Sequence, residues 1–189
     1  MRGLWGIVCL AALPVPLVAE EVAAFGQVVR YGLPAGFVPA FASPLGPGAT
    51  HYLEEAVPAG EDLEGWSQMV TLVALPDGAA MGLEGVAQQV AQLYAQACPG
   101  SLSAIALTPP AIAGAEAAAA VWLGCGTVAG GATSEAMVMI AGLRGPMIWA
   151  LQWAERGAAV AEAPTLDPAA WGPRVDQLAA GMVLCGAAC

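Results

Sequence analysis

The sequence predicts an α+β domain in which an antiparallel sheet of about five to seven strands carries two main helices packed on it. Two observations lead to this fold class. Short strand-like segments are separated by Gly and Pro turns, and two longer segments have apolar residues at helical spacing. Their order along the chain is strands, helix, strands, helix, which favours helices that cover an antiparallel sheet. The 189 residues suffice for one domain with its own core.

The first residues have the features of a secretory signal peptide. Arg2 provides a positive start, and residues 4–18 are apolar apart from two prolines and a glycine. We therefore expect a signal peptide over residues 1–19 and a single exported domain over residues 20–189, which is periplasmic or secreted. The apolar segment is too short and too interrupted to span a membrane, so the mature chain should have no transmembrane segment. Cys9 lies in a weak lipobox, and a lipid-anchored form is the alternative.

Three strands are expected before the first helix, at residues 25–31, 50–57 and 67–75. Residues 32–48 contain four prolines and are expected to form a loop that holds no more than a short edge strand near Phe37. A short acidic turn should join the second and third strands.

The clearer of the two helices is expected over residues 82–97, where apolar residues recur at helical spacing and glutamines occupy the other side. Pro99 should end it, because proline cannot continue the hydrogen-bond ladder. The second helix should begin with Asp167 as its N-cap, with Pro168 at the first helical position, and continue to Cys185. Four strands are expected between the helices, at residues 102–108, 118–125, 135–143 and 147–154.

Four cysteines follow the predicted signal peptide, which is an even number in a compartment that permits disulfides. They are Cys98, Cys125, Cys185 and Cys189, and they allow three pairings among which sequence alone does not choose. The pairing of Cys98 with Cys125 and of Cys185 with Cys189 is favoured, since a glycine and two alanines permit a tight closure at the chain end. A zinc site is the competing interpretation, although the cysteine spacing matches no common ligand pattern.

The charge of the chain excludes some classes of partner. There are five arginines, no lysine and fifteen acidic residues, and the net charge is −10. Binding to DNA or RNA needs a cationic face that displaces counterions, and docking on anionic lipid needs the same charge. We therefore expect no nucleic-acid partner, while the acidity alone identifies no positive one.

The segment from His51 to Thr71 is the best candidate for a ligand-facing region, with His51, Glu55, Glu61 and Trp66 as candidate residues. Alternate residues of a strand share one face, so His51 and Glu55 should point to the same side. Such a pair could hold a metal ion, although a solvated edge or a simple hydrogen bond is the more common arrangement. The more common role for a tryptophan after an acidic turn is to fill the core. The methionines and tryptophans of residues 137–153 are likewise interpreted as core residues rather than copper ligands.

Several short features together resemble a known group. These are Gly60-Glu61-x-x-x-x-Trp66-x-x-Met69-x-Thr71, a helix that ends in Ala97-Cys98-Pro99-Gly100, a strand that ends at Cys125, and the cysteine pair at the carboxy terminus. In these features the chain resembles small exported proteobacterial proteins of uncharacterised function. The order of elements is also similar to the α/β/α sandwich of PsbP-like proteins, which is an analogy of fold alone. The resemblance implies no catalytic residues.

The sequence contains no recognisable catalytic motif. A Ser–His–acid device would have to use His51, the only histidine, and there is no Gly-x-Ser-x-Gly elbow. The glycines of residues 124–131 lack the lysine of a phosphate-binding loop. We therefore predict a non-catalytic exported domain without a cofactor or metal, which binds an unknown protein or small molecule in the cell envelope. The alternatives are a hydrolase centred on His51 and an envelope metal-binding protein.

Overall fold

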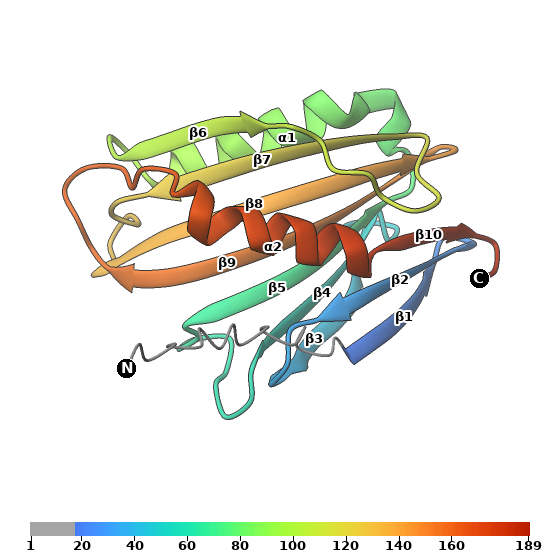
Figure 1. The fold of residues 1–189 in the computed structure, drawn as a ribbon, viewed down its shortest axis with the longest axis horizontal. Helices are drawn as coiled ribbons and strands as arrows, with labels where there is room; N and C mark the ends of the chain where they lie inside the picture. Colours follow the sequence, from blue (N-terminus) through green and yellow to red (C-terminus); the bar gives the residue numbers. More distant parts are fainter. Residues whose placement is uncertain (1–17) are drawn as a thin grey trace, which may run out of the picture.

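A computed structural model describes residues 18–189, so nearly all of the predicted signal peptide, Cys9 included, lies outside the described residues. A seven-stranded antiparallel sheet forms the centre of the molecule (Figure 1). In spatial order its strands are β3 (Phe37–Leu45), β4 (His51–Pro58), β5 (Gln68–Leu75), β9 (Met147–Ala158), β8 (Thr133–Arg144), β7 (Ala117–Cys125) and β6 (Leu102–Leu107). With two helices and a second small sheet added, the fold is α+β, as predicted.

The two faces of the large sheet are covered differently. Helix α1 (Gly78–Ala97) lies on one face, whereas α2 (Pro168–Gly181) and a three-stranded sheet lie on the other (Figure 1). The small sheet has the order β1 (Val18–Ala24), β2 (Gln27–Leu33) and β10 (Val183–Gly186). The fold is therefore a three-layered sandwich with the large sheet in the middle.

Alternation along the central strands sends apolar side chains into two separate cores. In β9, Trp149 and Leu151 belong to the core under α2, while Ile148 and Ala150 belong to the core under α1. A strand that is buried on both faces reads as an almost continuous apolar run. This explains why residues 136–153, which form most of β8 and β9, are so apolar. Neither of the two described helices has the length and apolar character that a membrane crossing requires.

The segment that forms the first hairpin of the small sheet differs from the sequence expectation. The predicted strand 25–31 is instead the turn and second strand of a hairpin, because Phe25 and Gly26 have φ values of 52° and 77°, and β2 begins after them. Two residues with positive φ form the turn that matches the twist of a two-residue hairpin. Strand β1, which precedes this turn, was not expected. It begins at Val18, and cleavage after Ala19 stays a prediction.

The predicted loop over residues 32–48 is also wrong, because residues 37–45 form the nine-residue strand β3. Its prolines are tolerated since β3 is an edge strand, and the register shifts between Pro39 and Phe41. The second helix does not reach Cys185. It ends at Gly181, Met182 takes an extended conformation, and Val183 and Leu184 pair with β2. The first helix begins four residues earlier than predicted and has a kink at Gly82.

Candidate functional site

A cleft of about 670 Å³ lies between α1 and the large sheet. It exists because α1 packs on β6, β7, β8 and β9, which leaves the same face of β4 and β5 without a helix over it. The wall that α1 contributes is mostly apolar, with Val86 and Val90 packed toward the sheet, and it also includes Gln89 and Tyr94. A large cleft between a helix and a sheet is a typical place for a small-molecule site.

A row of polar side chains crosses the floor of this cleft. Glu55 on β4 pairs in register with Thr71 on β5, and Thr71 pairs with Gln152 on β9. All three line the cleft and are half-buried. Residues paired on neighbouring strands lie about 5 Å apart, so the row is about 10 Å wide. Within residues 18–189 none of these three side chains has a hydrogen-bond partner, so their polar atoms remain free for a ligand.

The rows on either side of these polar residues are apolar. Leu53, Val73 and Ala150 form one, and Met69 and Ala154 belong to the other. Burial in these surroundings raises the pKa of the Glu55 carboxyl above its ordinary value, because desolvation disfavours the charged form. The floor is thus an apolar surface with one narrow polar band.

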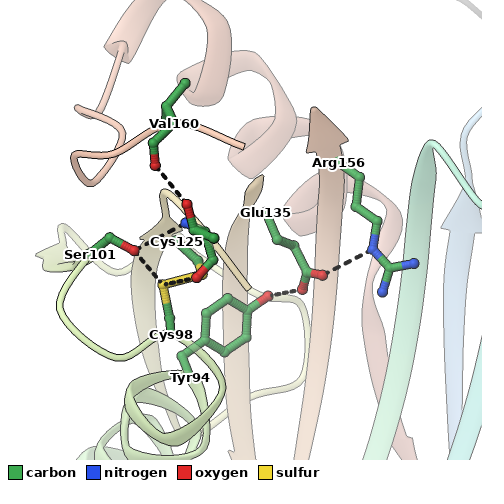
Figure 2. Close-up of a disulfide and its surroundings, with 8 residues drawn as sticks. Tyr94, Cys98, Ser101, Cys125, Glu135, Arg156 and Val160 are labelled. Atoms are coloured by element: carbon green, nitrogen blue, oxygen red, sulfur yellow. Dashed lines mark hydrogen bonds and ion pairs between the residues drawn. A yellow bond between two sulfur atoms is a disulfide. The ribbon is translucent and has the colours of Figure 1, made fainter. Parts of the chain in front are cut away.

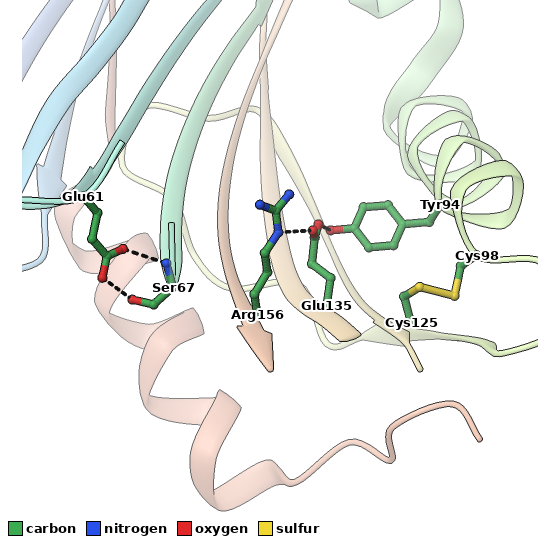
Figure 3. Close-up of polar contacts among 7 residues, drawn as sticks. All are labelled: Glu61, Ser67, Tyr94, Cys98, Cys125, Glu135 and Arg156. Atoms are coloured by element: carbon green, nitrogen blue, oxygen red, sulfur yellow. Dashed lines mark hydrogen bonds and ion pairs between the residues drawn. A yellow bond between two sulfur atoms is a disulfide. The ribbon is translucent and has the colours of Figure 1, made fainter. Parts of the chain in front are cut away.

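One end of the cleft is closed by a chain of side-chain contacts that joins α1 to the sheet (Figure 3). Tyr94 on α1 donates a hydrogen bond of 2.6 Å to Glu135, and the Nε of Arg156 donates one of 3.2 Å to the other oxygen of that carboxylate. The Arg156 guanidinium lies 3.7 Å from the centre of the Trp66 ring. The Glu135 carboxylate is therefore already neutralised, and so is the Arg156 cation.

A disulfide lies beside this closed end (Figure 2). Cys98, which directly follows the last residue of α1, is bonded to Cys125 on β7, and Cys125 pairs in register with Glu135. Tyr94 lies in the last turn of α1, so its hydrogen bond to Glu135 on β8 and the disulfide to Cys125 on β7 attach this end of the helix to two adjacent strands. The Ser101 hydroxyl also accepts a hydrogen bond from the Thr127 N–H. The second disulfide joins Cys185 to Cys189 and ties down the chain end.

The structure brings together three of the four candidate residues. His51, Glu55 and Trp66 line the cleft, whereas Glu61 does not. The Glu61 carboxylate accepts hydrogen bonds from the N–H and the hydroxyl of Ser67, at 2.6 and 2.7 Å, and so holds the loop before β5 (Figure 3). These hydrogen bonds lower the pKa of Glu61.

His51 and Glu55 lie on the same face of β4, but at different positions along the cleft. Four residues along a strand correspond to about 13 Å. The Nδ1 of His51 lies 3.3 Å from the Thr50 hydroxyl. Within residues 18–189 no three histidine, cysteine or acidic side chains gather as a metal site would require.

Sequence reasoning missed most of the polar side chains of the cleft. Gln152 and Arg156 are polar residues at positions four apart in β9, so they share a face of a strand that is otherwise mostly apolar. That spacing is the signal that could have identified them. Helical spacing puts Tyr94 on the apolar side of α1 and gives no sign that its hydroxyl contacts Glu135. Glu135 is the first residue of the strand expected at residues 135–143, and the sequence assigns no binding role to its side chain.

The buried carboxylate of Glu54 lies on the opposite face of the sheet from the cleft. Glu54 is 7% exposed and accepts hydrogen bonds of 2.9 Å from the hydroxyls of Tyr31 on β2 and Tyr52 on β4. Burial and the Glu54 charge raise the pKa of Tyr31, and they raise the pKa of Tyr52 to about 12. Burial and Glu135 likewise raise the pKa of Tyr94. Glu54 therefore joins the small sheet to the large one, outside the cleft.

These surroundings predict that the tyrosines of the folded protein resist ionisation. The chain has three tyrosines, and we expect almost no tyrosinate absorbance at about pH 11, although tyrosine in an unfolded chain ionises near pH 10. A tyrosine pKa that is higher in the folded state stabilises the fold below pH about 10, and this contribution is lost as the pH rises through the folded-state pKa. Ultraviolet absorbance and circular dichroism, followed together, provide the test. A tyrosinate that forms near pH 10 in folded protein would contradict the burial.

Comparison with known proteins adds a relation of fold. No family model matches the sequence, and no curated protein sequence matches it either. Among solved structures, the chain is similar to the solution structure of cyanobacterial PsbP (CyanoP) from Synechocystis sp. PCC 6803, with 11% sequence identity and a TM-score of 0.50. The match covers 94% of this chain and 98% of the other. At this identity the similarity shows a shared sandwich architecture and carries no function.

Proposed function

We propose that this protein is an exported, non-catalytic module that binds a small ligand in the cleft between α1 and the sheet. The observation that carries the proposal is the combination of a cleft of about 670 Å³ with apolar walls and a band of unpartnered polar groups on its floor. Pockets of this size and composition hold small molecules, with the apolar walls contributing affinity and the few polar groups fixing orientation.

Export is supported by the chemistry of the cysteines. The four cysteines of residues 18–189 form two disulfides, and disulfides persist in oxidising compartments such as the periplasm or the extracellular space. Residues 1–19 have the composition of a signal peptide. These observations support a ligand that is met in the cell envelope or outside the cell.

A binding role fits the site better than catalysis centred on His51. Among the described residues, the Thr50 hydroxyl is the one hydrogen-bond neighbour of the His51 ring. In the cleft, Glu135 and Arg156 neutralise one another. A general base must lie within hydrogen-bond reach of the group that it activates. The cleft instead has the volume and the free polar groups of a preformed binding site.

The proposal predicts that an uncharged apolar dye binds in the cleft and that filling the floor prevents it. Nile red should bind the native protein saturably with blue-shifted emission. Thr71→Trp places a large ring in the middle of the floor, and we expect it to weaken binding by at least about tenfold. Fluorescence titration measures both affinities.

The matched control is Ala170→Trp, which adds the same ring to an exposed position of α2 on the other face of the sheet. It should bind the dye as the native protein does. Equal affinity in the native protein and Thr71→Trp would contradict the proposal, and so would a loss of binding in Ala170→Trp alone. Circular dichroism verifies that both variants are folded.

A further inference from the structure

The cleft contains a single carboxylate that no cation neutralises. Glu135 is paired with Arg156 and also accepts a hydrogen bond from Tyr94, whereas Glu55 has no partner within the described part of the chain. A charge that is partly removed from water and left unpaired is unfavourable, and a bound cation would relieve it. This difference between the two acids indicates where a charged ligand group would lie.

Arg156 is the one arginine among the described residues that line the cleft, and its guanidinium is not available to an anionic ligand. The Arg156 side chain is 30% exposed, its Nε donates to Glu135, and its guanidinium covers the Trp66 ring. A ligand carboxylate or phosphate would have to compete with both contacts. The net charge of −10 also repels anions and attracts cations toward the protein.

The groups next to Glu55 suit the head of an amine. Thr71 lies beside Glu55 and Gln152 beside Thr71, so a hydroxyl oxygen and an amide oxygen are available in the same row as the carboxylate. An ammonium group is a donor of three hydrogen bonds and accepts none, which matches a row of acceptors. The apolar rows on both sides and the α1 wall suit an aliphatic body.

We propose that the ligand of the cleft is an amphiphilic amine, whose ammonium group pairs with Glu55 while its apolar body lies between β5 and α1. This inference rests on the proposed binding function and names its ligand class. Glu55 acts as the counter-ion, and Thr71 and Gln152 accept hydrogen bonds from the ammonium group. Val86 and Val90 on α1 contact the apolar body from the side opposite the sheet.

Three probes with the same apolar body and different heads test this assignment: octylammonium, octanol and octanoate. Hydrogen bonds to a charged partner are stronger than neutral ones, so octylammonium should bind at least about tenfold more tightly than octanol, and octanoate no more tightly than octanol. In Glu55→Gln the preference for octylammonium over octanol should disappear while octanol affinity is retained. Calorimetric titration at neutral pH gives the three affinities.

The control for net charge is Glu162→Gln, which removes the same charge from an exposed position in the loop before α2. It should keep the preference for octylammonium. The preference of the native protein should also weaken as the pH falls, because the raised pKa of Glu55 makes this carboxyl accept a proton earlier than an exposed glutamate does.

The outcomes separate the two proposals. If octanol or octanoate binds as tightly as octylammonium, the amine assignment is wrong while the cleft remains a binding site. If the preference for octylammonium survives Glu55→Gln, the counter-ion is another group and the assignment is also wrong. If none of the three compounds binds, and Nile red binding is unaffected by Thr71→Trp, the cleft is not a ligand site and both proposals fail.

Discussion

Replacement of both Cys98 and Cys125 by alanine is expected to destabilise the protein by about 3.5 kcal/mol. The bond closes a loop of 27 residues, and in the chain-entropy model a loop of that length restricts the unfolded chain by this amount. For a domain of this size the loss corresponds to a decrease in Tm of roughly 7–14 °C. Thermal unfolding followed by circular dichroism measures it, after non-reducing peptide mapping has established the pairing in the native protein.

The matched control is the double variant Cys185→Ala/Cys189→Ala. Its disulfide spans only four positions, so the same model gives about 2 kcal/mol. A larger loss in this variant than in the first would contradict the ranking. Peptides that join Cys98 to Cys185 or Cys189 would contradict the connectivity itself, and four free thiols in exported protein would exclude disulfides altogether.

Trp149→Ala is expected to reduce the free energy of unfolding by about 3–5 kcal/mol. Trp149 is fully buried in the central strand β9 and packs in the core under α2. Its removal leaves a cavity that the surrounding strands cannot close, because they are held in register on both sides. Urea unfolding monitored by circular dichroism gives the difference, and Trp149→Phe, which leaves a smaller cavity, should lose less.

Gln152→Ala on the same strand is the control for this prediction. Gln152 points to the opposite face, into the cleft, where it has no hydrogen-bond partner among the described residues, so its removal should change stability by no more than about 0.5 kcal/mol. If Gln152→Ala were as costly as Trp149→Ala, the assignment of the two faces would be wrong. Together the two variants separate the core that holds the fold from the surface that is offered to a ligand.

Much of the large sheet could be predicted because most of its pairings are local. Turns such as Arg144-Gly145-Pro146 lead one strand directly into its neighbour, so β3-β4-β5 and β9-β8-β7-β6 each follow from successive antiparallel connections. The pairing of β5 with β9 joins these two halves, and α1 and three strands separate them in the sequence. No local pattern encodes that contact, so the sheet order was not predictable.

The candidate site was predictable only in the part that β4 and the following loop supply. His51 and Glu55 share a strand face by simple alternation, and Trp66 follows in the next loop. Thr71 and Gln152 become neighbours of Glu55 only through strand pairing, and the latter only through the long-range contact between β5 and β9. Glu61 does not line the cleft, because its carboxylate holds the local loop through Ser67, and acidity alone does not distinguish these two roles.

The position of β2 between β1 and β10 has a consequence for the order in which the chain folds. Val29 pairs with Val22 in the hairpin and with Leu184 near the carboxy terminus, so the small sheet remains incomplete until the last residues of the chain are present. Contacts between distant parts of a chain form slowly, because the intervening segment must first be brought together. During synthesis, which starts at the amino terminus, the hairpin should therefore form early, and the second edge of β2 should stay unpaired until β10 is present.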